Sequence, residues 1–348
     1  MVAPILIFVA ALGVAFLLPL LHRLGRGLAY ALMLLTLGFM VWAPAQWLYA
    51  LLHGAQTPLL FTAGMKPPLS IMLRLGVVEA VVVLLVNLCV LLSALHLHRN
   101  LLRSGVQPLL LLLALAMGLD GIVMTRDAFN LFVFIEIASI ATYGLIALDT
   151  SRHALSAGFK YAVAGGISSL LFLLGVVYLY RVTGTLWLDQ MQAQLLVSGG
   201  GFLAMFLLLA AVLVELKPYP ANGWALDVYQ SVHPALAAVI GAAGSGAMLM
   251  ALYKLLPLLS HQAPPWLAGL GAFTFVASNL AAMRQSNARR MLGYSSVAQI
   301  GLLIAAMGLY RMHCPGDETA LLLPVGLLFV SHFLAKAGLF WLSGVVKG

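Results

Sequence analysis

The chain has 348 residues, of which 63% are hydrophobic and only 8% are charged, whereas a soluble domain carries roughly 25% charged residues. With a mean hydropathy of +1.06, this composition excludes a soluble globular protein and predicts a polytopic membrane protein. The net charge of +8 would indicate a nucleic-acid partner in a soluble chain, but most basic residues here lie in short loops, where they set membrane topology.

The apolar runs predict about eleven membrane-spanning helices, because a helix needs about 20 apolar residues to cross a bilayer. The first run has no charged segment before it and no small-residue cleavage site after it, so we expect a span of the mature protein rather than a signal peptide. Only 52–74 is long enough to be a sizeable loop. The predicted fold class is an all-α polytopic bundle with spans at 3–21, 28–51, 75–97, 108–125, 127–148, 154–180, 200–223, 233–257, 265–284, 291–310 and 319–346.

Basic residues divide unevenly between the loops on the two sides. An N-terminus outside the cell leaves nine of them in the inside loops (Arg23, Arg26, Arg99, Arg103, Arg152, Arg284, Arg289, Arg290 and Lys347) and five in the outside loops (Lys66, Arg74, Arg126, Arg181 and Arg311). The positive-inside rule favours this orientation, and an odd number of spans then places the C-terminus inside.

The seventh span contains a predicted helix break within "AVLVELKPYPANGW", residues 211–224. Pro218 and Pro220 each remove a backbone donor, which a membrane helix tolerates only where its backbone is buried or lines a cavity. Such a break gives water or protons access to nearby charges. Glu215 and Lys217 are about 200° apart around a helix, so they cannot face the same partner. We expect one of them to face Glu136 and the other to face the next helix.

Glu136 is the first candidate for a proton-carrying residue. It lies near the middle of its span with no charged neighbour within a helical turn, and a charge there costs about 2.5–3.5 kcal/mol. A carboxyl group in apolar surroundings can exchange protons near neutral pH. The alternative is a purely structural ion pair with a lysine of another helix.

Other ionisable residues inside the spans are candidate relays. Lys160 could relay a proton or extend its ammonium toward the membrane surface. His332 and Lys336 are four residues apart and share a helix face. Lys254 lies near the end of its span, where an ammonium that reaches the surface is the favoured interpretation.

Redox and metal chemistry within this chain is not expected. Most of the nine histidines lie in loops or at span ends, and no cluster has the ligand spacing of a haem or metal site. We therefore expect no cofactor and no metal. Asp120 and Glu79 lie near span ends, where we expect solvated side chains, and Cys89 is expected to pack as a small core residue.

Four stretches within 110–348 carry a family resemblance. They are "DAFNLFVFIEIASIATYGLIAL" with the "ALSAGFKYAVAGG" that follows, "PANGWALDVYQ", "MRQSNARRMLGYSSVAQIG" at 283–301, and "HFLAKAGLFWLSG". With these the chain resembles the antiporter-like membrane subunits of respiratory complex I, of Mrp cation/proton antiporters and of membrane-bound hydrogenases.

This resemblance implies two inverted five-helix repeats, each with a broken helix. It divides the chain into an N-terminal three-helix segment (1–107), a first repeat (108–257) and a partial second repeat (258–348). It also implies a coupled glutamate on the fifth span and lysine on the broken seventh span, with further lysines or histidines along the membrane centre. The implied location is the energy-coupling inner membrane, and the implied partners are other membrane subunits, homologous ones among them, and a redox arm.

The chain departs from the family pattern at the broken span. An ungapped alignment on Trp224 places Glu215, not Lys217, at the position of the family lysine, and places Asn222 and Leu226 where a histidine and a proline are common. In the eighth span Ser245 takes the place of the usual lysine, so Lys254 resembles the basic residue that ends that helix. The second repeat is expected to be incomplete, because a full member has about fourteen spans.

The function favoured by these observations is proton translocation, or alternatively Na⁺ translocation, by a subunit of a redox-driven complex of the NADH:quinone or hydrogenase type. Its relay residues are then Glu136, Lys160, Glu215, Lys217, Lys254, His332 and Lys336. A non-conducting structural or connecting subunit is the alternative, and a subunit of a stand-alone cation/proton antiporter is the least favoured. Whether the chain belongs to an enzyme stays open at this point.

Overall fold

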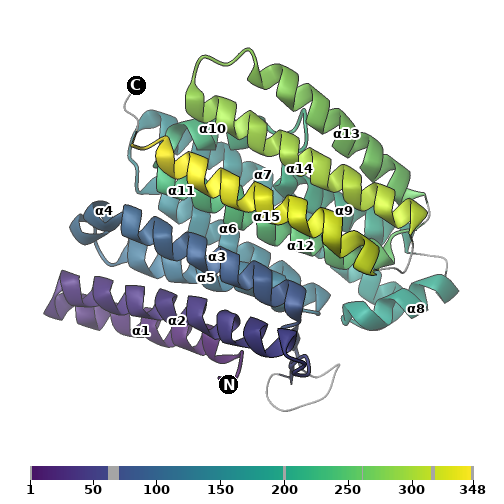
Figure 1. Ribbon diagram of the computed structural model, residues 1–348, viewed down its shortest axis with the longest axis horizontal. Coiled ribbons are helices and arrows are strands. Elements are labelled where there is room, and N and C mark those ends of the chain that lie inside the picture. Colours follow the sequence, from purple (N-terminus) through teal and green to yellow (C-terminus); the bar gives the residue numbers. More distant parts are fainter. Residues whose placement is uncertain (1, 62–69, 199–200, 261, 315–317, 346–348) are drawn as a thin grey trace.

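The protein is a multi-pass bundle of membrane-spanning helices (Figure 1). The computed structural model describes residues 2–61, 70–198, 201–260, 262–314 and 318–345. Within this part of the chain, ten helices are long and apolar enough to cross a membrane, and Phe202–Leu216 is a shorter apolar helix. The sequence predicted about eleven spans, and the difference lies at the predicted seventh span, which is the shorter helix Phe202–Leu216 followed by a break. The predicted all-α polytopic fold class is confirmed.

The first half of the chain supplies the first seven helices. It contains α1 (Leu6–Leu24), α2 (Arg26–Leu52), α3 (Val77–His96), the short α4 (His98–Arg103), α5 (Gln107–Met124), α6 (Ala128–Ala147) and α7 (Arg152–Thr183). In Figure 1, α1 and α2 lie at one edge of the bundle.

The second half begins with α8 (Leu188–Ser198), a helix that the sequence pattern did not predict, because 181–199 was expected to be a connection. Next come α9 (Phe202–Leu216), α10 (Gly223–Ser231), α13 (Ala263–Ala282), α14 (Ala288–His313) and α15 (Glu318–Leu342). Between α10 and α13 a single span contains α11 (Pro234–Ala238), the π-helix η2 (Val239–Gly244), α12 (Ser245–Leu255) and the 3₁₀ turn η3 (Leu256–Leu258). This span is almost entirely buried and so lies inside the bundle.

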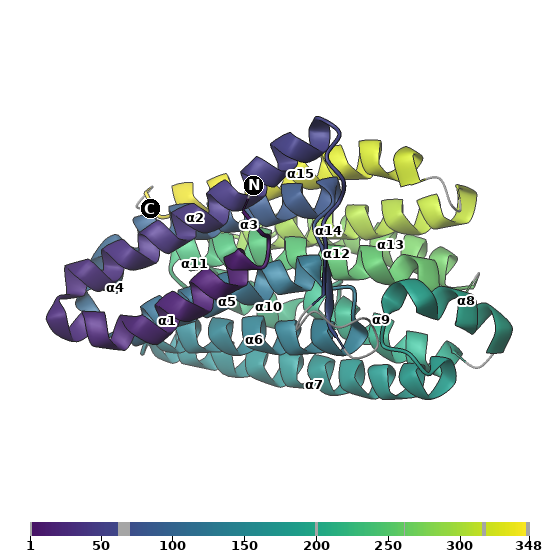
Figure 2. The ribbon, with the colours of Figure 1, turned by 90° about the horizontal axis from the view of Figure 1, so that it is seen from below.

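The two ends of the bundle differ. Figure 2 shows α4 at one end and α8 at the other, and we call these the α4 end and the α8 end. In the predicted loop 52–74, the strands β1 (Leu59–Phe61) and β2 (Met72–Arg74) pair antiparallel. Single bridges join Leu73 to Thr125 and Asp127 to Trp187, so the β2 strand and the segment before α8 are tied to the ends of α5 and α6.

Glycines allow α13 and α14 to pack closely. A Cβ added at Gly271 of α13 would overlap the backbone nitrogen of Ala305 and lie 2.5 Å from the carbonyl oxygen of Gly301, both in α14. Small residues at such contacts let membrane helices approach and gain van der Waals packing. Helix α13 lies at the edge of the bundle opposite α1 and α2 (Figure 1). It is therefore held in the bundle mainly by its contact with α14.

The predicted break in the seventh span is present. Helix α9 ends at Leu216, and Lys217 has the left-handed conformation with φ 53° and ψ 51°. Pro218 follows, and a proline disfavours the right-handed helical conformation of the residue before it. The helix resumes at Gly223, so 217–222 forms the break and separates α9 from α10.

Two expectations about solvated carboxylates are wrong. Asp120 is fully buried in α5, and both of its carboxylate oxygens accept from the amide of Asn87 in α3, at 3.0 and 2.8 Å. Glu79 is also buried and accepts from the backbone N–H of Gly76. Position along the span suggested solvent, but packing in the folded chain covers both side chains. Cys89 is buried, as expected.

Candidate functional site

Glu215 lies in the last turn of α9, directly before the break, with only 5% of its surface exposed. The hydroxyl of Tyr161, in α7, donates to its Oε2 over 3.5 Å. Its Oε1 has no hydrogen-bond partner among the described residues. A buried acceptor without a partner is costly, so this oxygen is a candidate point for water or a proton.

Tyr143 completes the surroundings of Glu215. A Cβ added at Gly165 of α7 would overlap the Tyr143 hydroxyl and lie 3.2 Å from Oε1 of Glu215, so these two groups share the space that the glycine leaves open. Ser139, one turn earlier in α6, hydrogen-bonds to Tyr143. The rings of Tyr143 and Tyr161 meet edge to face with centroids 4.8 Å apart, a favourable aromatic geometry.

Lys217 points toward α12, whereas Glu215 points toward α7. Its ammonium donates to the hydroxyl of Ser245 in α12 over 2.8 Å, although only 3% of the residue is exposed. It also lies 5.8 Å from the ring centre of Trp224 and 5.9 Å from that of Tyr229. Both distances suit a cation–π interaction, which stabilises a desolvated cation. Lys217 thus meets the residue that stands at the family's eighth-span lysine position.

Trp224 connects the two sides of the break. Its ring stacks on that of Tyr161 with centroids 4.3 Å apart and an interplanar angle of 13°. Tyr161 holds Glu215 and Trp224 lies under Lys217. The two stacked rings therefore lie between the two charged groups.

A cavity of about 30 Å³ lies between α5, α6, α9 and the η2–α12 span. Its polar lining consists of Ser139, Thr142, Tyr161, Glu215 and Lys217, and the rest of the lining is mainly aliphatic. A cavity needs about 10–15 Å³ to hold one water molecule, so this one is large enough for about two.

Two hydrogen-bonded polar pairs join α14 and α15 on the side of Lys217. His332 is hydrogen-bonded through Nδ1 to Oε1 of Gln299 over 2.8 Å, and Lys336 donates to the hydroxyl of Ser295 over 2.7 Å. Both partners lie in α14 and are four residues apart, like the pair in α15. The charges of Lys217 and Lys336 both act on His332, so the two pairs lie within electrostatic reach of the break.

Glu136 lies near the middle of α6. It is half-buried in α6 and makes no hydrogen bond or ion pair within the part of the chain that the structure describes. Its charge acts on Glu215 and on Tyr143. Of the two residues at the break, Glu215 is thus the one on which the charge of Glu136 acts. The alternative of a structural Glu136–lysine ion pair finds no support among the described residues.

Lys160 lies in the first third of α7, toward the α4 end, and does not line the cavity beside the break. Its ammonium pairs with the Asp227 carboxylate over 2.6 Å, and Arg290 pairs with the other oxygen of Asp227 over 2.8 Å. The Lys160 side chain is 53% exposed, which fits the interpretation that it reaches toward the surface. An open pocket of about 420 Å³, also lined by Ser156 and Asn287, lies beside this pair.

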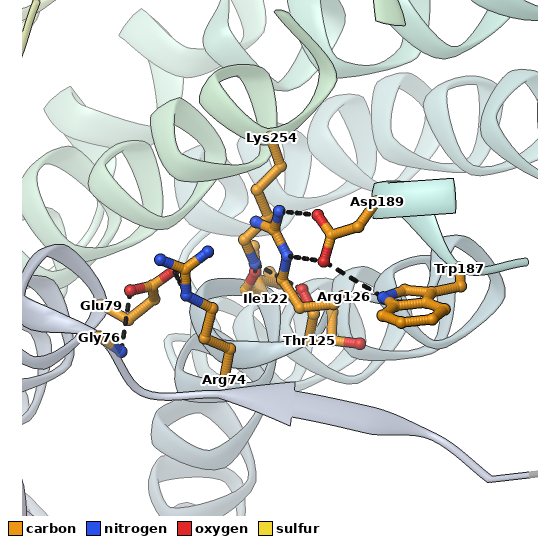
Figure 3. A network of polar contacts seen from close by, with 9 residues as sticks. All are labelled: Arg74, Gly76, Glu79, Ile122, Thr125, Arg126, Trp187, Asp189 and Lys254. Atoms are coloured by element: carbon orange, nitrogen blue, oxygen red, sulfur yellow. Dashed lines mark hydrogen bonds and ion pairs between the residues drawn. The ribbon is translucent and has the colours of Figure 1, made fainter. Parts of the chain in front are cut away.

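Lys254 is at the α8 end (Figure 3). It is buried and donates to the carbonyl oxygens of Ile122 and Thr125, at 2.6 and 2.8 Å, at the C-terminus of α5. A cation is stabilised there by the free carbonyls and the helix dipole. Figure 3 also shows the ion pairs between Arg126 and Asp189 and between Arg74 and Glu79 around it.

Sequence reasoning missed the tyrosines and the α14 partners. Glu136, Ser139 and Tyr143 have the spacing i, i+3, i+7, which places them on one helix face, so this signal was available. Gln299 and Ser295 were not recognisable, because nothing local shows that they oppose His332 and Lys336. Within the described ranges, no three His, Cys, Asp or Glu side chains are grouped as a metal site.

The family model for "NADH:quinone oxidoreductase/Mrp antiporter, TM" matches residues 125–348. The chain belongs to this family. The resemblance predicted from the sequence is thereby confirmed.

Two curated relatives illustrate the range of the family. NADH-quinone oxidoreductase subunit N of Desulforudis audaxviator is 33% identical over 252 residues, covering 68% of this chain and 48% of the relative. A subunit of the Na(+)/H(+) antiporter of Alkalihalophilus pseudofirmus is 30% identical over 241 residues, covering 66% of this chain and 47% of the relative. The chain thus spans about half the length of the curated relatives it matches.

The fold also matches a solved structure. One chain of the membrane-bound sulfane sulfur reductase (MBS), an archaeal respiratory membrane complex, superposes with a TM-score of 0.88 at 27% identity, over 98% of this chain and 70% of that one. The helices described above are therefore arranged as in that membrane subunit.

Proposed function

We propose that this chain is a proton-translocating subunit of a redox-linked membrane complex of the complex I or MBS kind. The observation that carries the proposal is the placement of Glu215 and Lys217, both buried, on either side of a helix break beside a partly polar cavity. Each charge inside a membrane costs about 2.5–3.5 kcal/mol on insertion scales, and a break in lipid is tolerated only beside a cavity or buried backbone. A proton relay needs both the buried charges and the helix break, so it explains why the chain contains them.

The proposed relay runs from Glu215 through Lys217 to His332 and Lys336. Neighbouring groups along this relay interact electrostatically: Lys217 with Glu215, and both Lys217 and Lys336 with His332. Groups coupled in this way release protons as a set rather than singly. A proton that arrives at Glu215 thus changes the proton affinity of Lys217, whose ammonium can then transfer its hydrogen-bonded proton toward the next group.

The remaining predicted relay residues flank this row. We propose that Lys160, with Asp227, lies at the access point of the α4 end, and that Lys254 lies at the access point of the α8 end. Glu136 tunes Glu215 by its charge. With the N-terminus outside and the C-terminus inside, the α4 end faces the inside of the cell.

We propose other membrane subunits as partners, homologous antiporter-like subunits among them, together with a redox arm. Membership of such a complex makes the chain part of an oxidoreductase without a redox site of its own. The three-part division at 107 and 257 stays a prediction, and so does the incomplete second repeat.

The test is proton pumping by the complex in vesicles, measured with an internal pH dye. We expect Lys217→Met and Glu136→Gln each to abolish or strongly reduce pumping, whereas Arg181→Gln, at an exposed position, leaves it intact. All variants should assemble normally on native gels. Normal pumping by Lys217→Met would overturn the proposal.

A structural or connecting subunit is the second candidate. It is favoured by the lack of an ion pair between Glu136 and Lys217 within the described residues. It predicts that Lys217→Met impairs assembly and leaves the pumping rate per assembled complex unchanged. A stand-alone cation/proton antiporter remains the least favoured candidate.

A further inference from the structure

We propose that Asp120 of α5 binds a proton permanently and that its neutral carboxyl group forms a reciprocal hydrogen-bonded pair with the side-chain amide of Asn87 in α3. This inference goes beyond the proposed relay and does not depend on it. It makes Asp120 a second protonated site, which attaches α3 to α5 and does not pass its proton on.

The first argument is the burial of the pair without a counter-charge. Asp120 and Asn87 are both fully buried. Glu79, Asp189 and Asp227 each form an ion pair with an arginine or a lysine, but Asp120 forms none within the described part of the chain. A buried carboxylate without a cation is much less stable than the neutral acid, because the charge has lost its water.

The second argument is a missing hydrogen-bond donor. The amide nitrogen of Asn87 donates one hydrogen to the carbonyl oxygen of Val83 over 3.0 Å. Its other hydrogen is shared by the two carboxyl oxygens of Asp120, at 3.0 and 2.8 Å, and the amide has no third hydrogen. The amide oxygen, Oδ1, is buried and has no partner among the described residues. A proton on Asp120 supplies that donor, since an acid hydroxyl beside the amide can donate to Oδ1 after a small rotation of the carboxyl group.

The ionisable groups on the helices packed against α5 interact elsewhere. Lys254 of α12 donates to backbone carbonyls, Glu79 of α3 accepts from a backbone N–H, and the charge of Glu136 of α6 acts on groups at the break. Among the described residues, Asn87 is the one whose side chain acts on the Asp120 carboxyl group. The missing proton therefore belongs to Asp120 itself.

Asp120 lies away from the proposed relay. Leu115, Leu119 and Ile122 of α5 line the cavity beside the break, and the helical period places Asp120 on another face of α5. Asp120 does not line the pocket beside Lys160 either. A proton on Asp120 thus has no route to the relay through these two spaces, and it stays bound once α3 and α5 have packed.

The bound ion is a proton rather than a metal cation. The N–H of Asn87 lies within hydrogen-bond distance of both carboxyl oxygens, so it occupies the side on which a cation would have to bind. Hard cations such as Mg²⁺ and Ca²⁺ take about six or more oxygen ligands, whereas the pair offers its carboxyl oxygens and one amide oxygen. Protonation forms one O–H bond with a proton taken from water and needs no oxidant or reductant.

The first experiment compares the infrared absorption of the native chain and of Asp120→Asn in lipid nanodiscs, in mildly acidic and in alkaline buffer. We expect the difference to contain a protonated-carboxyl band and no carboxylate band in either buffer. Asn87→Ala removes the amide and should shift the same band, so the assignment does not depend on one variant. Asp189→Asn is the matched control, because that carboxylate pairs with Arg126, and its difference should contain carboxylate bands.

The second experiment measures melting temperatures in the same nanodiscs. Asp120→Asn keeps the shape of the side chain and a neutral donor for Oδ1 of Asn87, so we expect a melting temperature close to that of the native chain. Asn87→Leu leaves the buried carboxyl group without a partner and should lower the melting temperature clearly. Asp120→Leu/Asn87→Leu removes both polar groups and should recover most of that loss.

Three results would overturn the inference. They are a carboxylate band that disappears in Asp120→Asn, a protonated-carboxyl band that changes when Na⁺ replaces K⁺ at constant ionic strength, and a melting temperature of Asp120→Asn as low as that of Asn87→Leu. Neither experiment measures pumping, so the loss of the proposed relay would leave this site standing.

Discussion

Glu215 and Lys217 lie two residues apart in the chain, yet their side chains meet different helices. The Glu215 carboxylate accepts from Tyr161 of α7, and the Lys217 ammonium donates to Ser245 of α12. The left-handed Lys217 residue, where α9 ends, turns the chain away from the helix axis. A carboxyl and an ammonium thus flank one cavity without forming an ion pair.

Ser245→Ala tests the position of Lys217. The variant removes the hydroxyl that accepts from the buried ammonium, and an unsatisfied buried donor costs about 1–3 kcal/mol. We expect a lower melting temperature and a reduced pumping rate. Ser245→Thr retains the hydroxyl and should restore most of the rate. Equal pumping by Ser245→Ala and the native chain would show that this bond does not position Lys217.

Gly165→Ala tests the space shared by Tyr143 and Glu215. The new methyl group would overlap the Tyr143 hydroxyl and must displace it. We expect pumping to fall strongly, because the displaced hydroxyl no longer lies beside Oε1. Gly166→Ala is the control, because an added Cβ there has nothing within 4 Å.

The double variant Gly165→Ala/Tyr143→Phe separates crowding from the loss of the hydroxyl. Removing the hydroxyl relieves the clash, so the two changes should be non-additive in stability by more than about 0.5 kcal/mol. Additive effects on the melting temperature would indicate that Tyr143 does not occupy the space left by Gly165.

Gly271→Ala tests the packing of α13 on α14. The added methyl meets backbone atoms of Gly301 and Ala305, which cannot rotate away as a side chain could. Overpacking of this kind costs about 1–3 kcal/mol, so we expect a clearly lower melting temperature. Gly269→Ala in the same helix has open space around it and should match the native chain. Equal stability of both variants would contradict the close approach.

His233 makes stability depend on pH at the α4 end. It precedes α11, and its Nδ1 accepts from the backbone N–H of Ala235, a role that only the unprotonated nitrogen can play. Burial, followed by the charges of His96 and Arg289, holds the pKa of His233 below its ordinary value. The cap therefore contributes fully above the unfolded pKa of about 6.5 and is lost as the pH falls through the lower folded pKa.

We expect the melting temperature in nanodiscs to fall on acidification, and His233→Asn to reduce that fall. Asparagine also caps a helix N-terminus but does not titrate in this range, so the cap survives at low pH. The cap contributes about 0.5–2 kcal/mol. An unchanged pH dependence in His233→Asn would assign the acid sensitivity to other groups.

Much of the site could be predicted from local patterns. Pro218 and Pro220, two residues apart in an apolar run, predicted the break, because each lacks a backbone donor and its ring clashes with the preceding helical turn. A single proline is tolerated, since Pro44 lies within the continuous helix α2. The spacing of four residues between His332 and Lys336 was enough to predict that they share one helix face. Local patterns did not determine, in contrast, whether Lys160 acts inside the membrane or reaches its surface. Its exposed ion pair depends on Asp227, which lies 67 positions away in the chain.

The sequence by itself determined the membrane spans, the break, the ionisable residues within the spans and the family. These follow from composition, from periodicity and from backbone chemistry that acts within a few residues. Only the tertiary structure decided that Glu215 faces α7 while Lys217 faces α12, that Gln299 and Ser295 oppose His332 and Lys336, and that Asp120 is buried against Asn87. The physical reason is that these contacts join separate helices, and the packing of whole helix surfaces, rather than any local pattern, determines which side chains meet.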